Sequence, residues 1–459
     1  MLAVSKALRL FGKFIFSVFV RHNIFLPLLI LFWLVNKRST TFSWSKTTGS
    51  SKSKITLLAV NYELFRGDLE LLDGSGEFKI IRIPVYWQWQ LIDVFYTQDE
   101  KNNNNIVVDW YKSTRQGDSL KGSEGLQRFF SDFLPRLYKV LNVDCIVSAN
   151  IRYLPDLDWL HVTRQIGVPS VLLFRESLLL TKDIYEGVIN RHKAFGILLT
   201  DHVIAHSHVV ANCFIESDIV KSNQITVCGN LRMETFANRI DKPSISAQPV
   251  SRKRIVLFHF PRHSHRYPNK EYTELFDDTM DVFFTLAQKR QDIEFIVKSK
   301  KEALSTYKGS ASRSDPFDIA NRCWPQHHNA NNFSIQIDTD PQELIETSDV
   351  VCGFYSTVLL EASIKQIPIV IPFFDYFGST LEAQKYPFLD YLDLFDVASN
   401  KTHLMEIISW RFANPEIPPN IQIFRRKLFE EYVSPLDGKV LTRTVTTIKN
   451  IAGRKRAKI

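Results

Sequence analysis

Residues 349–372 read DVVCGFYSTVLLEASIKQIPIVIP, and this stretch decides the fold class. An apolar run typical of a buried strand ends at Gly353, and Ser356 and Thr357 then carry the side chains that cap a new helix. A second apolar run, 367–372, ends at Pro372. The stretch therefore predicts a strand, a helix and a second strand, which is the unit from which parallel sheets are built.

The same alternation recurs along the chain from Lys54 onward. The apolar runs predict strands at 55–60, 78–85, 144–148, 170–174, 202–206, 224–228, 254–258, 294–298, 333–337, 349–352 and 367–372. Helical spacing predicts helices at 126–142, 156–166, 270–290, 341–347 and 357–364, with Pro135 expected to kink or interrupt the first. We therefore expect an α/β protein with two Rossmann-like domains facing a cleft, preceded by an N-terminal membrane-associating segment.

Changes in composition suggest where the parts begin and end. Residues 304–332 lack clear periodicity and are expected to form a surface insertion. The expected parts are a membrane anchor (1–38), a linker (39–53), a first Rossmann-like acceptor domain (54–240), a second linker (241–253), a Rossmann-like nucleotide-donor domain (254–421), closing helices (422–450) and a basic tail (451–459).

The positive charge of this 459-residue chain is concentrated at its N-terminal end. The net charge is +8, but residues 1–52 hold eight Lys/Arg and no Asp or Glu, which leaves 49 residues of each sign in the remainder. A nucleic-acid-binding body spreads positive charge over a face or groove, so nucleic acid is not an expected partner. With 45% hydrophobic and 23% charged residues, the chain is not a disordered protein.

The first 38 residues contain two apolar pieces, 14–20 and 24–35, separated by Arg21-His22-Asn23. Neither piece reaches the ~20 residues that a spanning helix needs. A short signal-anchor, an interfacial or re-entrant anchor and a cleaved signal peptide remain open, beside a helix that simply packs on the fold. Membrane association is our expectation, with the membrane surface as a partner.

Five cysteines are scattered along the chain without a CxxC motif or metal-ligand spacing. This pattern is typical of reduced thiols, and it predicts that the catalytic body lies on the cytoplasmic face of the membrane. No metal and no other cofactor is expected from it.

The helix that begins at Ser356-Thr357 has two interpretations. Its free N–H groups could hold an anion, with Glu361 one turn later accepting hydrogen bonds from ribose hydroxyls. Alternatively, these residues only cap a helix, and Glu361 is a surface residue.

The stretch resembles the donor-site signature of GT-B glycosyltransferases, S-T-x-x-x-E-A followed by a Pro-led strand. Residues 227–236, VCGNLRMETF, are similar to the G-N-P-R-x-D-x-F segment that closes the first domain in part of this clan, with Leu231 in place of Pro and Glu234 in place of Asp. Surface-polysaccharide enzymes are the most similar groups, including CDP-glycerol glycerophosphotransferases and capsule Kdo transferases. UDP-N-acetylglucosamine 2-epimerases share the fold.

The resemblance implies a metal-independent transferase that moves a sugar or polyol phosphate from a nucleotide-activated donor to a glycan or lipid-linked acceptor in surface polysaccharide synthesis. It implies donor contacts from Gly353, Ser356, Thr357, Glu361, Gly229 and Arg232. Two alternatives stay open: a UDP-sugar 2-epimerase, and a non-catalytic glycan-binding or scaffold protein on a degenerate GT-B fold.

Other candidates rest on position alone. His259 and Arg262 follow the first strand of the second domain and Lys298 ends the next one, so all three could contact a diphosphate. A metal at His263 and His265 is the alternative, but no carboxylate has ligand spacing to them.

The catalytic base is expected in the first domain. Glu63 follows the first strand and Glu176 follows the strand at 170–174, and either carboxylate could deprotonate an acceptor hydroxyl. A structural ion pair or a helix cap is the alternative for both.

Asp338-Thr-Asp340 has the D-x-D form of metal-dependent GT-A transferases, but Pro341 and a helix follow it, so an N-cap is expected. The chain contains no GxGxxG, P-loop, HExxH or GxSxG motif, which argues against NAD enzymes, NTPases, zinc proteases and hydrolases.

Overall fold

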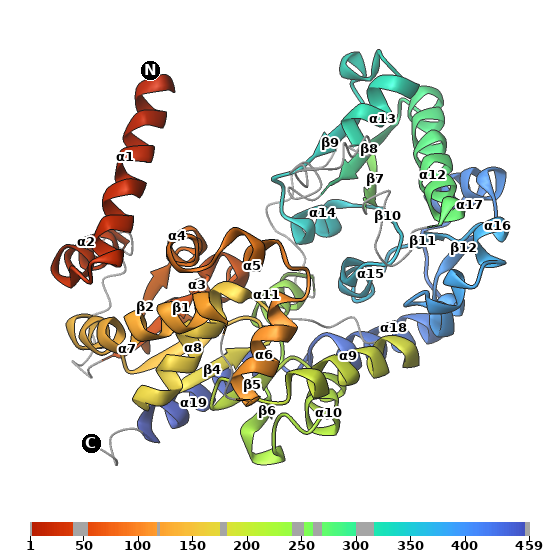
Figure 1. Cartoon of the computed structure of the whole chain (residues 1–459). Coiled ribbons are helices and arrows are strands. Elements are labelled where there is room, and N and C mark those ends of the chain that lie inside the picture. Colours follow the sequence, from red (N-terminus) through yellow and green to blue (C-terminus); the bar gives the residue numbers. More distant parts are fainter. Residues whose placement is uncertain are drawn as a thin grey trace. The chain divides into compact units, whose positions relative to one another are not determined.

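The computed structural model describes residues 2–39, 54–116, 120–174, 181–240, 252–259, 269–299 and 316–454 (Figure 1). The chain divides into two compact units. The first comprises Met1–Glu176, Val188–Arg232 and Asp437–Ile459, and the second comprises Ser177–Gly187 and Met233–Leu436. Each unit is built on one six-stranded sheet.

The sheet of the first unit has the order β2-β1-β3-β4-β5-β6, and all of its neighbouring strands are parallel. Its strands are β1 (Ile55–Val60), β2 (Phe78–Ile83), β3 (Cys145–Ser148), β4 (Ser170–Leu173), β5 (His202–Ala205) and β6 (Ile225–Val227). The chain first builds outward from β1 to β2 and then returns to β3 on the other side of β1. This reversal between β1 and β3 is the point where such sheets bind ligands.

Helices connect these strands, as parallel pairing requires. They are α3 (Asp68–Gly74), α4 (Val85–Phe95), α5 (Gln98–Asn102), α6 (Ile106–Gln116), α7 (Lys121–Leu141), α8 (Leu154–Ile166), α9 (Lys182–Phe195), α10 (His208–Glu216) and α11 (Leu231–Ile240). The helix α7 runs through Pro135 without ending, contrary to expectation. Pro135 and Ser131, whose carbonyl loses its helical donor, are both exposed, so water can satisfy that oxygen.

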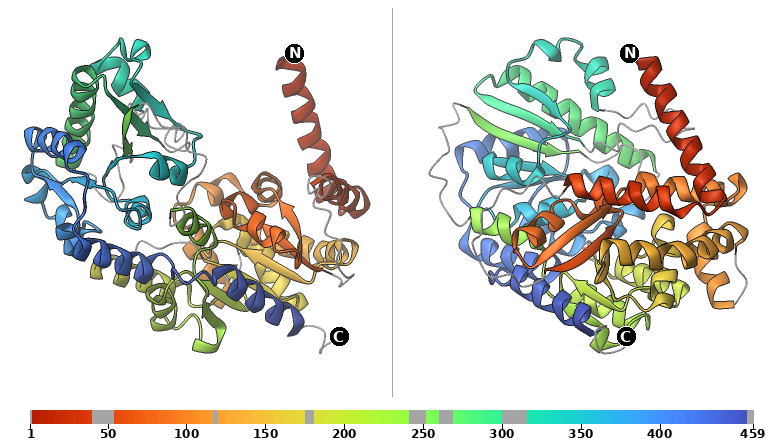
Figure 2. Two further views of the ribbon diagram at one scale, coloured as in Figure 1. Left: turned by 180° about the vertical axis from the view of Figure 1, so that it is seen from behind. Right: turned by 90° about the vertical axis from the view of Figure 1, so that its left-hand side faces the viewer.

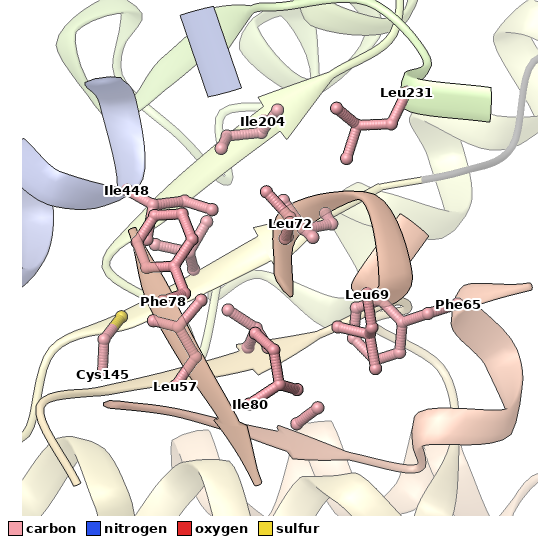
Figure 3. Packing of buried hydrophobic residues seen from close by; sticks show 14 of the residues in the cluster. Leu57, Phe65, Leu69, Leu72, Phe78, Ile80, Cys145, Ile204, Leu231 and Ile448 are labelled. Atoms are coloured by element: carbon pink, nitrogen blue, oxygen red, sulfur yellow. The ribbon is translucent and has the colours of Figure 1, made fainter. Parts of the chain in front are cut away.

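The last helix of the chain completes the core of the first unit. Figure 3 shows Ile448 of α19 (Val440–Gly453) among Leu57, Phe78 and other buried side chains of the sheet. Leu69 and Leu72 of α3 belong to the same cluster. The helix α18 (Pro419–Tyr432) belongs instead to the second unit, so the two expected closing helices serve different units.

The sheet of the second unit has the order β12-β11-β10-β7-β8-β9 and is also parallel throughout. Its strands are β7 (Lys253–Phe258), β8 (Ile293–Lys298), β9 (Phe333–Gln336), β10 (Val350–Gly353), β11 (Ile369–Pro372) and β12 (Asp396–Ala398). Here the strand order reverses between β7 and β10. The predicted pair of Rossmann-like sheets is therefore confirmed.

The helices of the second unit are α12 (Lys270–Lys289), α13 (Pro316–Cys323), α14 (Pro341–Thr347), α15 (Thr357–Ala362), α16 (Asp375–Gly378), α17 (Lys401–Ala413) and α18. The helix α13 lies within the stretch 304–332, for which no regular structure was expected. Residues 300–315 lie outside the described part of the chain.

Two helices precede the first sheet, α1 (Leu2–Arg21) and α2 (Phe25–Ser39), and Figures 1 and 2 show them as a helical pair at one side of the first unit. The helix α1 contacts α4, and α2 contacts α7. Within the described ranges, no helix combines the length and the apolar character needed to cross a membrane.

Candidate functional site

Three strand ends lie level with one another at the reversal point of the second sheet. Gly353 of β10 is the register partner of Phe258 of β7, which is in turn the partner of Lys298 of β8. His259 and Ser299 directly follow these strands, so the candidates Gly353, His259 and Lys298 share one edge of one sheet. Ligands of parallel α/β sheets bind outside such an edge.

Gly353 leaves room for a close approach between strand and helix. A β-carbon at this position would lie 3.1 Å from Cδ2 of Leu359 and 3.5 Å from Cβ of Phe258. The absence of a side chain therefore lets α15 pack tightly over the end of β10, and it keeps the backbone of the turn accessible from the sheet edge.

The turn after Gly353 begins α15 as predicted. Ser356 is the N-cap, and its Oγ accepts a hydrogen bond from the backbone N–H of Val358 at 3.4 Å. Thr357 is the first helical residue. Glu361 is 7% exposed, so the alternative that placed it on the surface is wrong.

Lys298 has a buried ammonium group. Nζ donates to the carbonyl oxygens of Ser299 at 2.9 Å and Ile337 at 2.5 Å. Since an ammonium group has three N–H bonds, one remains without an acceptor among the described residues. Burial lowers the pKa of Lys298, and the charges of Asp338 and Asp340 act in the opposite direction.

His259 lies beside Lys298 and is also buried. Its backbone N–H donates to the carbonyl of Lys298 at 3.0 Å, and its Nδ1 lies 3.4 Å from Oγ of Ser299. The ring packs edge-on against Phe276. Arg262, His263 and His265 lie outside the described residues.

The reversal point of the first sheet holds a buried polar network that the sequence did not single out. Gln88 accepts a hydrogen bond from the backbone N–H of Asn61 at 2.9 Å and donates to Oδ1 of Asp156 at 2.9 Å. The other oxygen of Asp156 is buried without a partner among the described residues. Burial raises the pKa of Asp156 to about 7, and the charge of Glu63 contributes in the same direction.

A signal for this network was present in the sequence. Residues 154–160 read LPDLDWL, and all seven are buried, including Asp156 and Asp158. Acidic residues between apolar residues on the inner face of a helix indicate a buried network. Asp158 indeed accepts hydrogen bonds from Tyr96, Trp110, Ser123 and Gln127.

Glu63 caps a helix. Both of its carboxylate oxygens accept from the backbone N–H of Val85, at 3.2 and 3.1 Å, at the start of α4. Glu176 lies outside the described residues. The assignment of either carboxylate as the base therefore stays a prediction.

Gly229 and Arg232 lie in the first unit, after β6. Gly229 has φ 103°, in the left-handed region that favours glycine. Arg232 donates its backbone N–H to Oδ1 of Asn230 at 3.2 Å, and its Cδ lies 3.9 Å from where a β-carbon of Gly67 would stand. Their predicted donor contacts remain predictions.

Asp340 is the N-cap of α14, as expected, and accepts from the backbone N–H groups of Gln342 and Glu343. In the part of the chain that the structure describes, no group of three or more His, Cys, Asp or Glu side chains is arranged to hold a metal ion.

No family model and no curated protein matches this chain in sequence. Among solved structures, UDP-GlcNAc 2-epimerase from Neisseria meningitidis, bound to UDP-GlcNAc, is similar at 11% identity and a TM-score of 0.44, with coverage of 86% of this chain and 100% of that chain. The UDP-forming α,α-trehalose-phosphate synthase from Burkholderia xenovorans is similar at 12% identity and a TM-score of 0.46, with coverage of 87% and 99%.

The glycosyltransferase of kitacinnamycin is similar at 10% identity and a TM-score of 0.45, with coverage of 88% of this chain and 100% of that chain. The similar structures thus include glycosyltransferases and UDP-GlcNAc 2-epimerases, the two groups that the resemblance in the sequence names.

Proposed function

We propose that the protein is a glycosyltransferase that moves a sugar, or a polyol phosphate, from a nucleotide-activated donor to a glycan or lipid-linked acceptor in surface polysaccharide synthesis. The observation that carries this proposal is the edge formed by Gly353, His259 and Lys298 at the reversal point of the second sheet. The remaining N–H of Lys298 is suited to a donor phosphate oxygen, since charge-assisted hydrogen bonds are strong.

In the proposed reaction, the acceptor hydroxyl oxygen forms a bond to the anomeric carbon as the bond from that carbon to the nucleotide phosphate breaks. The hydroxyl proton passes to a carboxylate of the first unit, for which Glu176 and Glu63 are the candidates. The electron pair leaves with the phosphate oxygen, and the Lys298 ammonium stabilises that charge. Arg262 would add a second cation, and Glu361 would hold the ribose.

We also propose that the transfer takes place at the cytoplasmic face of a membrane, where a lipid-linked acceptor would be held. The support is the composition of residues 1–52, which contain basic and apolar side chains and no acidic ones.

Thermal unfolding of the full chain with CMP, CDP, UDP and GDP, each in Mg²⁺ and in EDTA, tests the donor assignment. A nucleotide at 100 times its dissociation constant stabilises its protein by about 2.7 kcal/mol. We expect one nucleotide to raise the melting temperature equally in both conditions. A folded sample that none of them stabilises would instead support the non-catalytic alternative, and conversion of a UDP-sugar without any acceptor would support the epimerase.

A further inference from the structure

The helix α2 presents large apolar side chains to solvent. Leu26, Ile30, Trp33 and Leu34 are spaced so that they share one face of the helix, which we call the outer face of α2. Their exposed fractions are high for apolar residues: 68, 47, 42 and 46% in that order. Contiguous exposed apolar surface marks a site of interaction.

The opposite face of α2 fixes the helix to the first unit. Phe25 contacts Phe129 and Phe133 of α7, at ring-centroid distances of 5.7 and 5.8 Å. Phe32 is 1% exposed and meets the ring of Trp87 of α4 edge-on at 4.5 Å. Because the inner face already packs, the outer face is held in place and left open.

Basic residues stand at both ends of this helix. Arg21 and His22 are exposed just before α2, and Lys37 and Arg38 occupy its last turn, whereas residues 24–36 contain no charged residue. An apolar stretch of about 12 residues rises only ~18 Å along its axis, which is short of the ~30 Å hydrocarbon core of a bilayer.

A helix that is apolar along its length and basic at both ends suits a position in the plane of the membrane surface. There the apolar face enters the boundary between headgroups and acyl chains, and the basic side chains extend to lipid phosphates.

We propose that the outer face of α2 docks the protein onto an anionic lipid bilayer, with α2 lying in the surface rather than crossing it. The lack of acidic residues in residues 1–52 argues for an anionic surface as the occupant. This proposal specifies the membrane part of the proposed function and is independent of the donor chemistry, because vesicle binding needs no nucleotide.

Co-sedimentation of the full chain with vesicles tests it. We expect binding to vesicles of phosphatidylcholine with 30% phosphatidylglycerol, at least tenfold weaker binding to pure phosphatidylcholine, and release from the anionic vesicles by 0.5 M NaCl. Equal binding to both vesicle types, or binding to neither, would overturn the proposal.

A matched pair of variants locates the docking face. Leu26→Ser/Ile30→Ser/Trp33→Ser should reduce binding at least tenfold. The control variant carries the same three changes at exposed apolar residues of the second unit and should bind like the wild type: Leu381→Ser/Ile423→Ser/Trp410→Ser. Equal binding by the two variants would contradict the assignment.

Two further measurements separate insertion from other causes. Trp33→Phe keeps an apolar ring, so it should bind the anionic vesicles while part of the vesicle-induced blue shift of tryptophan fluorescence is lost. Analytical ultracentrifugation without lipid should show no difference in oligomeric state between the wild type and the outer-face variant. A wild-type dimer that this variant dissociates would overturn the proposal in favour of a second copy on this face.

Discussion

Lys298 and Lys365 both donate to main-chain carbonyl oxygens of the second unit, but Lys298 binds two of them and Lys365 binds three. The acceptors of Lys365 are the carbonyls of Ile345, Glu346 and Ser348, at 2.8, 2.8 and 2.7 Å. All three N–H bonds of Lys365 are thus used within the fold, whereas Lys298 keeps one for a ligand. The two lysines therefore separate a binding role from a structural one.

Gly353→Ala should destabilise the protein by about 1 kcal/mol, because the new β-carbon would lie 3.1 Å from Cδ2 of Leu359. Adding Leu359→Val removes a methylene at that contact and should recover part of the melting temperature. If Gly353 also lines the donor site, nucleotide affinity will stay low in the double variant. Recovery of both properties together would show that the glycine serves packing alone.

Glu63→Gln should leave both stability and transfer rate near the wild-type values, since the amide oxygen can still accept from the N–H of Val85. Glu63→Ala removes this cap and should cost about 1 kcal/mol in thermal unfolding. Glu176→Gln should lower kcat at least 100-fold without changing the melting temperature, as loss of a general base does. A 100-fold loss in Glu63→Gln would move the base to that residue.

Asp156→Asn should remove part of the pH dependence of stability. The pKa of Asp156 is raised to about 7 in the folded protein, above its unfolded value near 4, so the folded state binds the extra proton between these values. The wild type therefore loses stability relative to the variant as pH rises through this window, by up to about 1.4 kcal/mol per pH unit.

Melting temperatures at pH 5 and pH 8 measure this effect. The two proteins should melt together at pH 5, and the variant should melt several degrees higher at pH 8. Asp132→Asn neutralises an exposed acid of the same unit and serves as the control, with no comparable change between the two pH values. An Asp156→Asn variant that follows the wild type at both pH values would show that this carboxyl is not buried in its charged form.

The sheets were predictable because each buried parallel strand, such as 55–60 or 367–372, is a short apolar run with polar sequence on either side. The strand β12 was missed because only three residues form it and two of them are half-buried. The level arrangement of Gly353, Phe258 and Lys298 depends on register, which no local pattern encodes. The sequence likewise could not show that Glu361 is buried or that Glu63 caps a helix 22 residues away.

The donor site at Lys298 is tested most directly by calorimetric titration of the stabilising nucleotide into the full chain and two variants, Lys298→Met and Lys365→Met. We expect Lys298→Met to weaken the nucleotide at least tenfold, about 1.4 kcal/mol, with little change in melting temperature. Lys365→Met should lower the melting temperature and keep the wild-type affinity. Wild-type affinity in a folded Lys298→Met protein would contradict the donor site described here.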